Sequence, residues 1–265
     1  MMNLDDYKLV VCDMDGTLLN DEKELSSEVS WIKEKLRSKG IDFTLASGRN
    51  IHILENYIQQ IKIEVPVICN NGANIFYHSK CLHQQNINMD DLESATKVLE
   101  ENNIGYIAYA NDEVFVRKTN PIIPFIKRLE GKVDITYTTT FVRPKKAILK
   151  LVCIDEDDNK MKRIQKELEF ICKESILLKS EGSIYTFSDR LATKGEAIHR
   201  LCNYLNIKEE QVLVFGDNYN DISMFEVAGY GVAVANAESA LKEVAKAFCG
   251  SNRNNGVIEY LKQFI

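Results

Sequence analysis

Two aspartates stand two positions apart at the end of an apolar run. The run LVVC covers residues 9–12, Asp13 and Asp15 follow it with one residue between them, and Gly16 comes next. Side chains at positions i and i+2 of an extended chain point the same way, so both carboxylates can reach one substrate. The pair can therefore serve as nucleophile and general acid/base, and Gly16 lets the backbone turn sharply away behind it.

Three more polar clusters follow apolar runs, and a lysine opens the helical segment before the last of them. They are Ser47-Gly48-Arg49 after FTLA, Asn70-Asn71-Gly72 after VPVIC, Gly216-Asp217 with Asn220-Asp221 after VLVF, and Lys194. The carboxyl ends of parallel strands meet at one edge of a sheet, where open α/β sheets bind their ligands. We therefore expect these residues, which are far apart in the sequence, to converge in space.

Carboxylates gathered at such an edge repel one another strongly unless a cation lies among them. Asp13, Asp15, Asp217 and Asp221 offer hard oxygen ligands of the kind that Mg²⁺ selects. With the cation bound, the lysine, the serine hydroxyl and the backbone amides around Gly48 would suit the three oxygens of a phosphoryl group. The residues thus predict phosphoryl transfer in which one aspartate forms an aspartyl-phosphate.

The elements that must position these residues alternate between apolar strands and amphipathic helices at both ends of the chain. The first end predicts strands at 8–13, 42–47 and 65–78, the last turning at Asn71-Gly72, a helix that Ser26 or Ser27 caps and residues 39–40 end, and a helix at 51–61. The second end predicts strands at 211–217, 231–235 and 247–250 and helices at about 195–205, 222–228, from 238 and from 257. This alternation is typical of α/β proteins with a Rossmann-like, doubly wound parallel sheet.

The middle of the chain has a different pattern. Strand-like pieces at 105–118, 133–142, 147–155 and 183–189 surround two helical segments, at about 90–102 and 159–172. This composition predicts an α+β unit with an antiparallel sheet, inserted into the first. We expect one domain made of residues 1–83 and 189–265 and a second made of residues 84–188.

Composition limits the classes of partner. The chain has 265 residues and a net charge of −6, its basic residues are scattered, and no apolar run is long enough to span a membrane. We therefore expect no nucleic acid and no membrane partner, a cytoplasmic location, and a monomer or weak homodimer. Seven widely spaced cysteines, mostly in apolar segments, are expected to be free thiols.

Four short segments together resemble a known family. DMDGTLL, ASGR, Lys194 in TKGEAI, and GDNYND are similar, in this order, to the four motifs of phosphatases of the haloacid dehalogenase (HAD) superfamily. AGYGVAVANA and NNGV also resemble the Cof-type members, subfamily IIB, whose α/β cap is inserted between the second and third motifs. The resemblance implies a Mg²⁺-dependent phosphatase with a catalytic core and a cap domain that selects a small phosphorylated substrate.

The resemblance also implies a role for each matching residue. Asp13 would be the nucleophile and a metal ligand, and Asp15 the acid/base, with its backbone carbonyl a further metal ligand. Asp217 would bind the metal directly, and Asp221 directly or through water. The phosphoryl group would be held by Ser47, Gly48, Lys194 and Asn220.

Several alternatives stay open at this point. Asn71-Gly72 is equally well a tight hairpin turn or a substrate contact. A phosphosugar mutase would share the fold and the aspartyl-phosphate, and a non-catalytic protein could use the same fold to bind a phosphorylated metabolite. Thr17 is expected to hydrogen-bond within its own loop and help to hold the aspartates. The four histidines show no spacing typical of metal ligands, so we assign them no chemistry.

Overall fold

The chain folds into two compact units. The structure, a computed structural model, describes residues 3–111, 113–117, 134–138 and 146–265. The first unit comprises Met1–His83 and Thr193–Ile265, and the second comprises Gln84–Ala192. The second unit thus ends at Ala192, whereas the sequence predicts an end at residue 188. The reason is that the turn after β11 (Ile184–Asp189) stays attached to that strand, with the Ala192 N–H donating to the Asp189 carbonyl at 2.9 Å.

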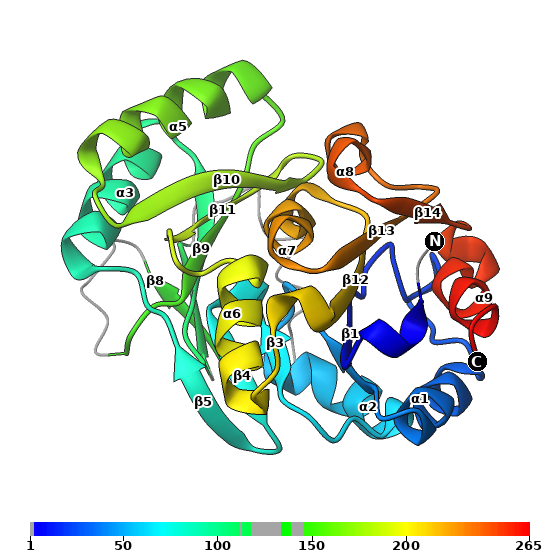
Figure 1. Cartoon of the computed structure of the whole chain (residues 1–265). Coiled ribbons are helices and arrows are strands. Elements are labelled where there is room, and N and C mark those ends of the chain that lie inside the picture. Colours follow the sequence, from blue (N-terminus) through cyan, green and yellow to red (C-terminus); the bar gives the residue numbers. More distant parts are fainter. Residues whose placement is uncertain (1–2, 112, 118–133, 139–145) are drawn as a thin grey trace. The chain divides into compact units, whose positions relative to one another are not determined.

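A five-stranded parallel sheet forms the centre of the first unit (Figure 1). Its strands, in spatial order, are β14 (Ala247–Cys249), β13 (Tyr230–Val234), β12 (Val212–Gly216), β1 (Leu9–Cys12) and β2 (Asp42–Leu45). β1 and β12 are buried along their whole length, as expected for parallel strands that helices cover on both faces. The apolar runs of the sequence are therefore the central strands of this sheet.

Six helices cover the two faces of this sheet. One group is α1 (Val29–Ser38), α2 (Ile51–Ile61) and α9 (Gly256–Lys262), and the other is α6 (Lys194–Leu205), α7 (Ile222–Val227) and α8 (Ser239–Val244). The two groups lie on opposite sides of the strands (Figure 1). From β1 the chain moves outward to β2, and it returns on the other side of β1 with β12. The predicted doubly wound sheet is confirmed, and its strand order reverses between β1 and β12, where such folds bind ligands.

A small three-stranded sheet follows β2. It contains β3 (Val67–Cys69), β4 (Asn74–Tyr77) and β5 (Lys80–Gln84), and β3 and β4 are antiparallel. A parallel bridge between Ala46 and Ile68 joins β3 to the end of β2. The turn predicted at Asn71-Gly72 is present as a short 3₁₀ segment, Asn70–Gly72. β5 was not predicted because its sequence, KCLHQ, is too polar to suggest a strand.

The start of α1 differs from the prediction. Glu28, rather than Ser26 or Ser27, is the residue that precedes the helix, and it makes no side-chain cap. Ser26 instead accepts the N–H of Glu28 with its hydroxyl, at 3.3 Å, and the N–H of Val29 with its carbonyl, at 3.2 Å. The serine thus stabilises the turn before the helix rather than the helix itself.

In the described part of the second unit, two helices pack on one sheet. The helices are α3 (Met89–Glu101) and α5 (Asp158–Ile171), and the strands, in spatial order, are β10 (Ser175–Glu181), β11, β9 (Lys150–Ile154), β6 (Gly105–Tyr109), β7 (Glu113–Arg117) and β8 (Asp134–Thr138). The sheet is antiparallel as predicted except that β7 and β8 are parallel. β10 was missed because its apolar run is short and leads into Lys-Ser-Glu. An apolar cluster that includes Leu99, Met161 and Phe187 forms the core of this unit.

Two expectations from composition can be compared with the described part of the chain. The seven cysteines form no disulfide, as predicted. Among the residues that the structure describes, no helix combines the length and the apolar character that crossing a membrane requires.

Candidate active site

The structure brings the ends of several core strands together. Asp13 directly follows β1 and extends its pairing to β12, since its N–H donates to the Phe215 carbonyl at 2.9 Å. Ser47, just beyond β2, donates its N–H to the Ile68 carbonyl at 2.9 Å. Asp217 directly follows β12. The polar clusters of the sequence therefore lie at the carboxyl edge of the parallel sheet, beside the point where its strand order reverses.

Lys194 is completely buried and pairs with two of the aspartates. Its Nζ lies 2.5 Å from Asp13 Oδ1 and 2.5 Å from Asp221 Oδ1. The lysine is the first residue of α6, and the side chain of Thr193 caps that helix by accepting the Glu196 N–H at 3.2 Å. The helix start therefore fixes the position from which the ammonium group reaches the carboxylates.

Gly72 lets the loop after β3 reach the start of α6. Its φ is +100°, and a Cβ placed there would lie 2.0 Å from the Thr193 carbonyl oxygen. Any other residue would be strained in conformation and would also push this loop away from Lys194. The Asn71-Gly72 turn thus supports the site through backbone contact.

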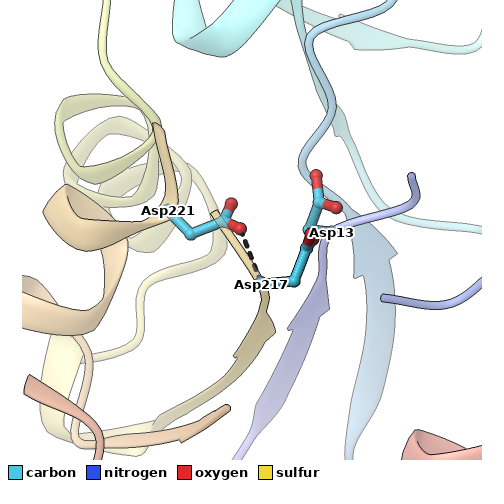
Figure 2. Close-up of side chains that lie close together, drawn as sticks. All are labelled: Asp13, Asp217 and Asp221. Carbon is cyan, nitrogen blue, oxygen red and sulfur yellow. Dashed lines mark hydrogen bonds between the residues drawn. The ribbon is translucent and has the colours of Figure 1, made fainter. Parts of the chain in front are cut away.

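Three buried aspartates form one group (Figure 2). Asp13, Asp217 and Asp221 each offer a carboxylate oxygen, and these oxygens lie within 4.8 Å of one another. Asp221 Oδ2 accepts the backbone N–H of Asp217 at 2.9 Å and that of Asn218 at 3.0 Å. Thr17 Oγ1 donates to Asp217 Oδ1 at 2.7 Å. Thr17 therefore holds an aspartate 200 positions away rather than bonding only within its own loop, as the sequence had suggested.

The electrostatics of this group are unbalanced. Burial raises the pKa of Asp13 well above its ordinary value; Lys194 opposes the shift, and Asp221 and Asp217 reinforce it. Burial, and then repulsion from Asp221, raises the pKa of Asp217 to about 7. Burial disfavours the charge on Lys194, yet Asp13 and Asp221 raise its pKa above its usual range. Lys194 thus supplies one positive charge beside three buried carboxylates, and ionising all three carboxylates at once is unfavourable.

The donor set fits a hard divalent cation. All three members are carboxylates, two of them have raised pKa values because their negative charges are buried close together, and their oxygens are near enough to share one ion. Hard cations prefer oxygen ligands, and a bound cation would relieve the repulsion within the group. The residues present therefore match a metal site of the magnesium or calcium type.

Gly16 gives Asp217 the room that this arrangement needs. Its φ is +87°, and a Cβ at this position would lie 2.4 Å from Asp217 Oδ2. The sharp turn predicted after the aspartate pair is therefore present, and it has a second purpose that the sequence did not indicate. The glycine allows the first loop and the loop after β12 to approach each other.

Asp15 has partners of its own. Arg49 donates to it twice, from Nε to Oδ2 and from Nη2 to Oδ1, both at 2.6 Å, and Lys23 Nζ lies 2.9 Å from Oδ1. The Arg49 guanidinium also lies 5.2 Å from the centre of the Tyr57 ring. Burial opposes ionisation of Asp15, but the hydrogen bonds and charges of Arg49 and Lys23 lower its pKa. This carboxylate is thus held in one orientation by a bidentate arginine.

Sequence reasoning gave no role to Arg49 or Lys23. Arg49 was noticed as part of the segment ASGR, and its place close after Ser47 was a signal that could have led to it. Lys23 lies in a polar loop with no distinguishing pattern, and only the fold brings it to Asp15.

The remaining predicted residues form a second group around Asn71. Asn71 Oδ1 accepts from Asn220 Nδ2 at 3.0 Å, and its N–H donates to the Ser47 carbonyl at 3.0 Å. Gly48 lies directly against the Asn71 side chain. Ser47 is buried, and its hydroxyl oxygen accepts the Arg49 N–H at 3.1 Å. Asn71 therefore does more than turn the chain, because it joins the loops after β2, β3 and β12.

Comparison with known proteins agrees with this geometry. A sequence model of the haloacid dehalogenase-like hydrolases matches residues 10–261. The chain is 26% identical over 286 residues to phosphatase YwpJ of Bacillus subtilis, covering 97% of this chain and 100% of that one. It is 25% identical over 268 residues to pyridoxal phosphate phosphatase YbhA of Escherichia coli, covering 96% and 97%.

A solved structure shows the same fold. The HAD subclass IIB sugar phosphatase BT4131 superposes with a TM-score of 0.84 and 21% sequence identity, over 97% of this chain and 98% of that one. The family match spans both segments of the first unit and the second unit between them. The chain therefore belongs to the haloacid dehalogenase-like hydrolases and is a phosphatase of that family.

Proposed function

We propose that this phosphatase is a Mg²⁺-dependent phosphomonoester hydrolase that acts on small phosphorylated metabolites through an aspartyl-phosphate intermediate. The observation that carries the proposal is the buried aspartate group around Lys194, whose Nζ lies 2.5 Å from both Asp13 Oδ1 and Asp221 Oδ1. A nucleophilic carboxylate beside a fixed cation is what attack on an anionic phosphoryl group requires.

The aspartate group would hold the cation. Asp13 and Asp217 would bind it through carboxylate oxygens, Asp221 directly or through water, and Asp15 through its backbone carbonyl. When bound, Mg²⁺ would supply positive charge that offsets the charge of the phosphoryl oxygens.

In the first step, a carboxylate oxygen of Asp13 attacks phosphorus. A phosphorus–oxygen bond forms to Asp13, the bond to the leaving alcohol breaks, and Asp15 donates a proton to the departing oxygen. Lys194 and Ser47 hold the phosphoryl oxygens during this transfer, with the Gly48 backbone beside them.

In the second step, water attacks the phosphorus of the aspartyl-phosphate and Asp15 accepts a proton from that water. Inorganic phosphate leaves and the Asp13 carboxylate is restored. Arg49 and Lys23 support this step because they favour the ionised form of Asp15, which is the form that accepts a proton. Asn220, joined to Asn71, would help to orient the phosphoryl group.

The two units would divide the work. The first unit contains every residue assigned to the chemistry, and the second would act as a cap that selects the substrate. Sugar phosphates and phosphorylated cofactors are the substrate classes we propose, since one relative is named a pyridoxal phosphate phosphatase and a structural neighbour a sugar phosphatase.

The assigned site uses one chain only, which suits a monomer or weak homodimer. Seven cysteines without a disulfide suit a reducing, cytoplasmic location.

The test is phosphate release from a panel of phosphorylated metabolites, with Mg²⁺ and with chelator. Asp13→Asn should keep the fold and lose turnover by at least about 10³-fold, because the amide is not a nucleophile. Normal turnover in the folded variant would contradict the assignment of Asp13. Transfer of the phosphoryl group to a second hydroxyl of a sugar phosphate, without release of phosphate, would instead indicate a mutase.

A further inference from the structure

Two asparagines near the C-terminus hold the loop that follows the aspartate pair. Asn236 Nδ2 donates to the Gly16 carbonyl at 2.8 Å, and Asn252 Nδ2 donates to the Leu19 carbonyl at 2.9 Å. The two are also joined to each other, since the Asn252 N–H donates to Asn236 Oδ1 at 3.0 Å. We call Asn236 and Asn252 the asparagine pair. It links the first loop to segments 220 and 233 positions later.

The asparagine pair is built on the edge of the sheet that carries the site. Asn236 lies just after β13, and its neighbour Glu238 donates its N–H to the Asp217 carbonyl at 2.8 Å. Asn252 begins a 3₁₀ turn after β14 and is 4% exposed. The buried amide of Asn252 is costly to leave unsatisfied, so its bond to the Leu19 carbonyl resists distortion, whereas the bond from Asn236 to Gly16 lies at the exposed surface.

The loop of residues 16–19 is joined to two residues of the candidate site, Asp15 and Asp217. The Gly16 carbonyl belongs to the residue directly after Asp15, and the next residue, Thr17, donates to Asp217 Oδ1 at 2.7 Å. The loop's internal bonds run from the N–H groups of Leu18 and Leu19 to the Met14 carbonyl, at 3.0 and 2.9 Å. These bonds shape the loop but do not attach it to the sheet. Attachment comes from the asparagine pair and Thr17, together with the contacts of Arg49 with Asp15 and of Arg253 with Asp21.

We propose that Asn236 and Asn252 are positioning residues for the phosphatase reaction. They do not touch the substrate. They fix the peptide between Gly16 and Thr17 and so, together with Arg49, which orients the Asp15 carboxylate, the distance of Asp15 from the leaving oxygen. This inference rests on the proposed function, in which Asp15 protonates the leaving group.

The chemistry of the leaving group separates positioning from general support of the fold. A sugar alkoxide leaves only if it is protonated, whereas p-nitrophenolate leaves readily without a proton. Displacing Asp15 should therefore lower kcat/KM for a sugar phosphate and spare kcat/KM for p-nitrophenyl phosphate, because kcat/KM reports the steps up to departure of the leaving group and not the later attack of water. Loss of active protein would reduce both rates by the same factor.

The experiment uses Asn236→Asp, which keeps the acceptor for Asn252 but removes the donor to Gly16. Its kcat/KM on a sugar phosphate should fall about tenfold or more, and its kcat/KM on p-nitrophenyl phosphate should stay within about threefold. Asn236→Ala, which adds no charge, should behave in the same way. Equal losses on both esters, or no loss on either, would overturn the proposal.

The matched control is Arg253→Gln. Arg253 is the residue after Asn252, and its side chain forms an exposed ion pair with Asp21 of the same loop at 2.7 Å. Unlike the bonds of the asparagine pair, this contact goes to a side chain rather than to a loop carbonyl. Its kcat on both esters should stay within about twofold of the unmodified protein.

A second readout does not depend on activity. Amide hydrogen exchange at Thr17, Leu18 and Leu19 should be at least about tenfold faster in Asn236→Asp than in Arg253→Gln, because the loop opens more often. Unchanged exchange rates in Asn236→Asp would show that the asparagine pair does not hold the loop. If the unmodified protein hydrolyses neither ester, the proposed function is wrong, and the exchange rates alone decide whether the asparagine pair holds the loop.

Discussion

Both units bury aspartates, but they surround them in opposite ways. In the first unit, Asp13, Asp217 and Asp221 lie within 4.8 Å of one another around a single lysine. In the second unit, Asp91 on α3 accepts three backbone N–H groups, from Lys173 at 3.2 Å, Glu174 at 3.0 Å and Ser175 at 2.9 Å.

The difference separates the carboxylates that we propose to react from one that stabilises the fold. Asp91 joins the start of α3 to the chain between α5 and β10, and its charge is met by hydrogen-bond donors. The aspartates of the first unit repel one another, and burial raises the pKa of Asp13 and Asp217. Buried charges that destabilise one another are retained where chemistry uses them, whereas a satisfied carboxylate stabilises the fold.

The largest effect that tests this contrast should come from Lys194→Met. The change leaves Asp13 and Asp221 without their ammonium partner, so kcat should fall about 10²–10³-fold. The free energy of unfolding should fall by about 3–5 kcal/mol, since a buried ion pair loses one member. Steady-state kinetics and urea denaturation, both in Mg²⁺, measure the two losses.

Lys97→Met is the control for that change. Lys97 is an exposed lysine of α3 whose Nζ lies 4.0 Å from Glu101, so its removal should alter neither activity nor stability appreciably. An active Lys194→Met protein would show that the buried pair around Lys194 is structural, like Asp91.

A smaller effect, confined to stability, should follow Asp91→Ala. Three N–H groups lose their acceptor, so the free energy of unfolding should fall by about 2–3 kcal/mol. Well below the melting temperature, kcat should stay within about threefold, because the assigned chemistry uses only residues of the first unit. Asp90→Ala, a change at the exposed aspartate beside it, is the matched control and should be nearly neutral. Loss of turnover in a fully folded Asp91→Ala protein would show that the contrast between the units is wrong.

A further effect on stability should be a change in pH dependence in Asp217→Asn. The pKa of Asp217 is raised from 3.8 to about 7, so between these values the folded protein holds a proton that the unfolded chain has lost. Stability of the metal-free protein should therefore fall as pH rises from about 4 to 7, since the folded state then binds more protons than the unfolded state.

The amide introduced by Asp217→Asn has no proton to titrate in this range, and its oxygen can still accept the bond from Thr17. With chelator present, the unmodified protein should lose more stability than the variant between about pH 5 and pH 8. Denaturation curves at the two pH values give the comparison. Equal pH dependence in the two proteins would mean that Asp217 is not under electrostatic strain.

Most of the core could be predicted because its signals are local. Strands such as β1 and β12 are continuous apolar runs, and the helix at 51–61 has the same bounds in the structure. Predictions failed where the local signal is weak or the pairing is remote. β5 and β10 contain many polar residues, and the parallel pairing of β7 with β8 depends on a connection that local pattern does not describe.

The candidate site likewise has residues that local sequence predicts and contacts that depend on distant parts of the chain. The groups that we propose to react could be identified from residue types at strand ends, because a parallel sheet brings those ends to one edge. From the sequence alone, Asn71-Gly72 is equally well a tight hairpin turn or a substrate contact, because both would use the same two residues. Its bond to Asn220, 149 positions away, appears only in the fold.

The sequence by itself determined which groups are candidates for the reaction, since the spacing of Asp13 and Asp15 and the four motifs are properties of short segments. The tertiary structure decided which partner each group has. Lys194 meets Asp13 across 181 positions, Thr17 meets Asp217 across 200, and Arg49 meets Asp15 across 34. Such contacts depend on how strands and helices pack, and packing is set by the whole chain rather than by any one segment.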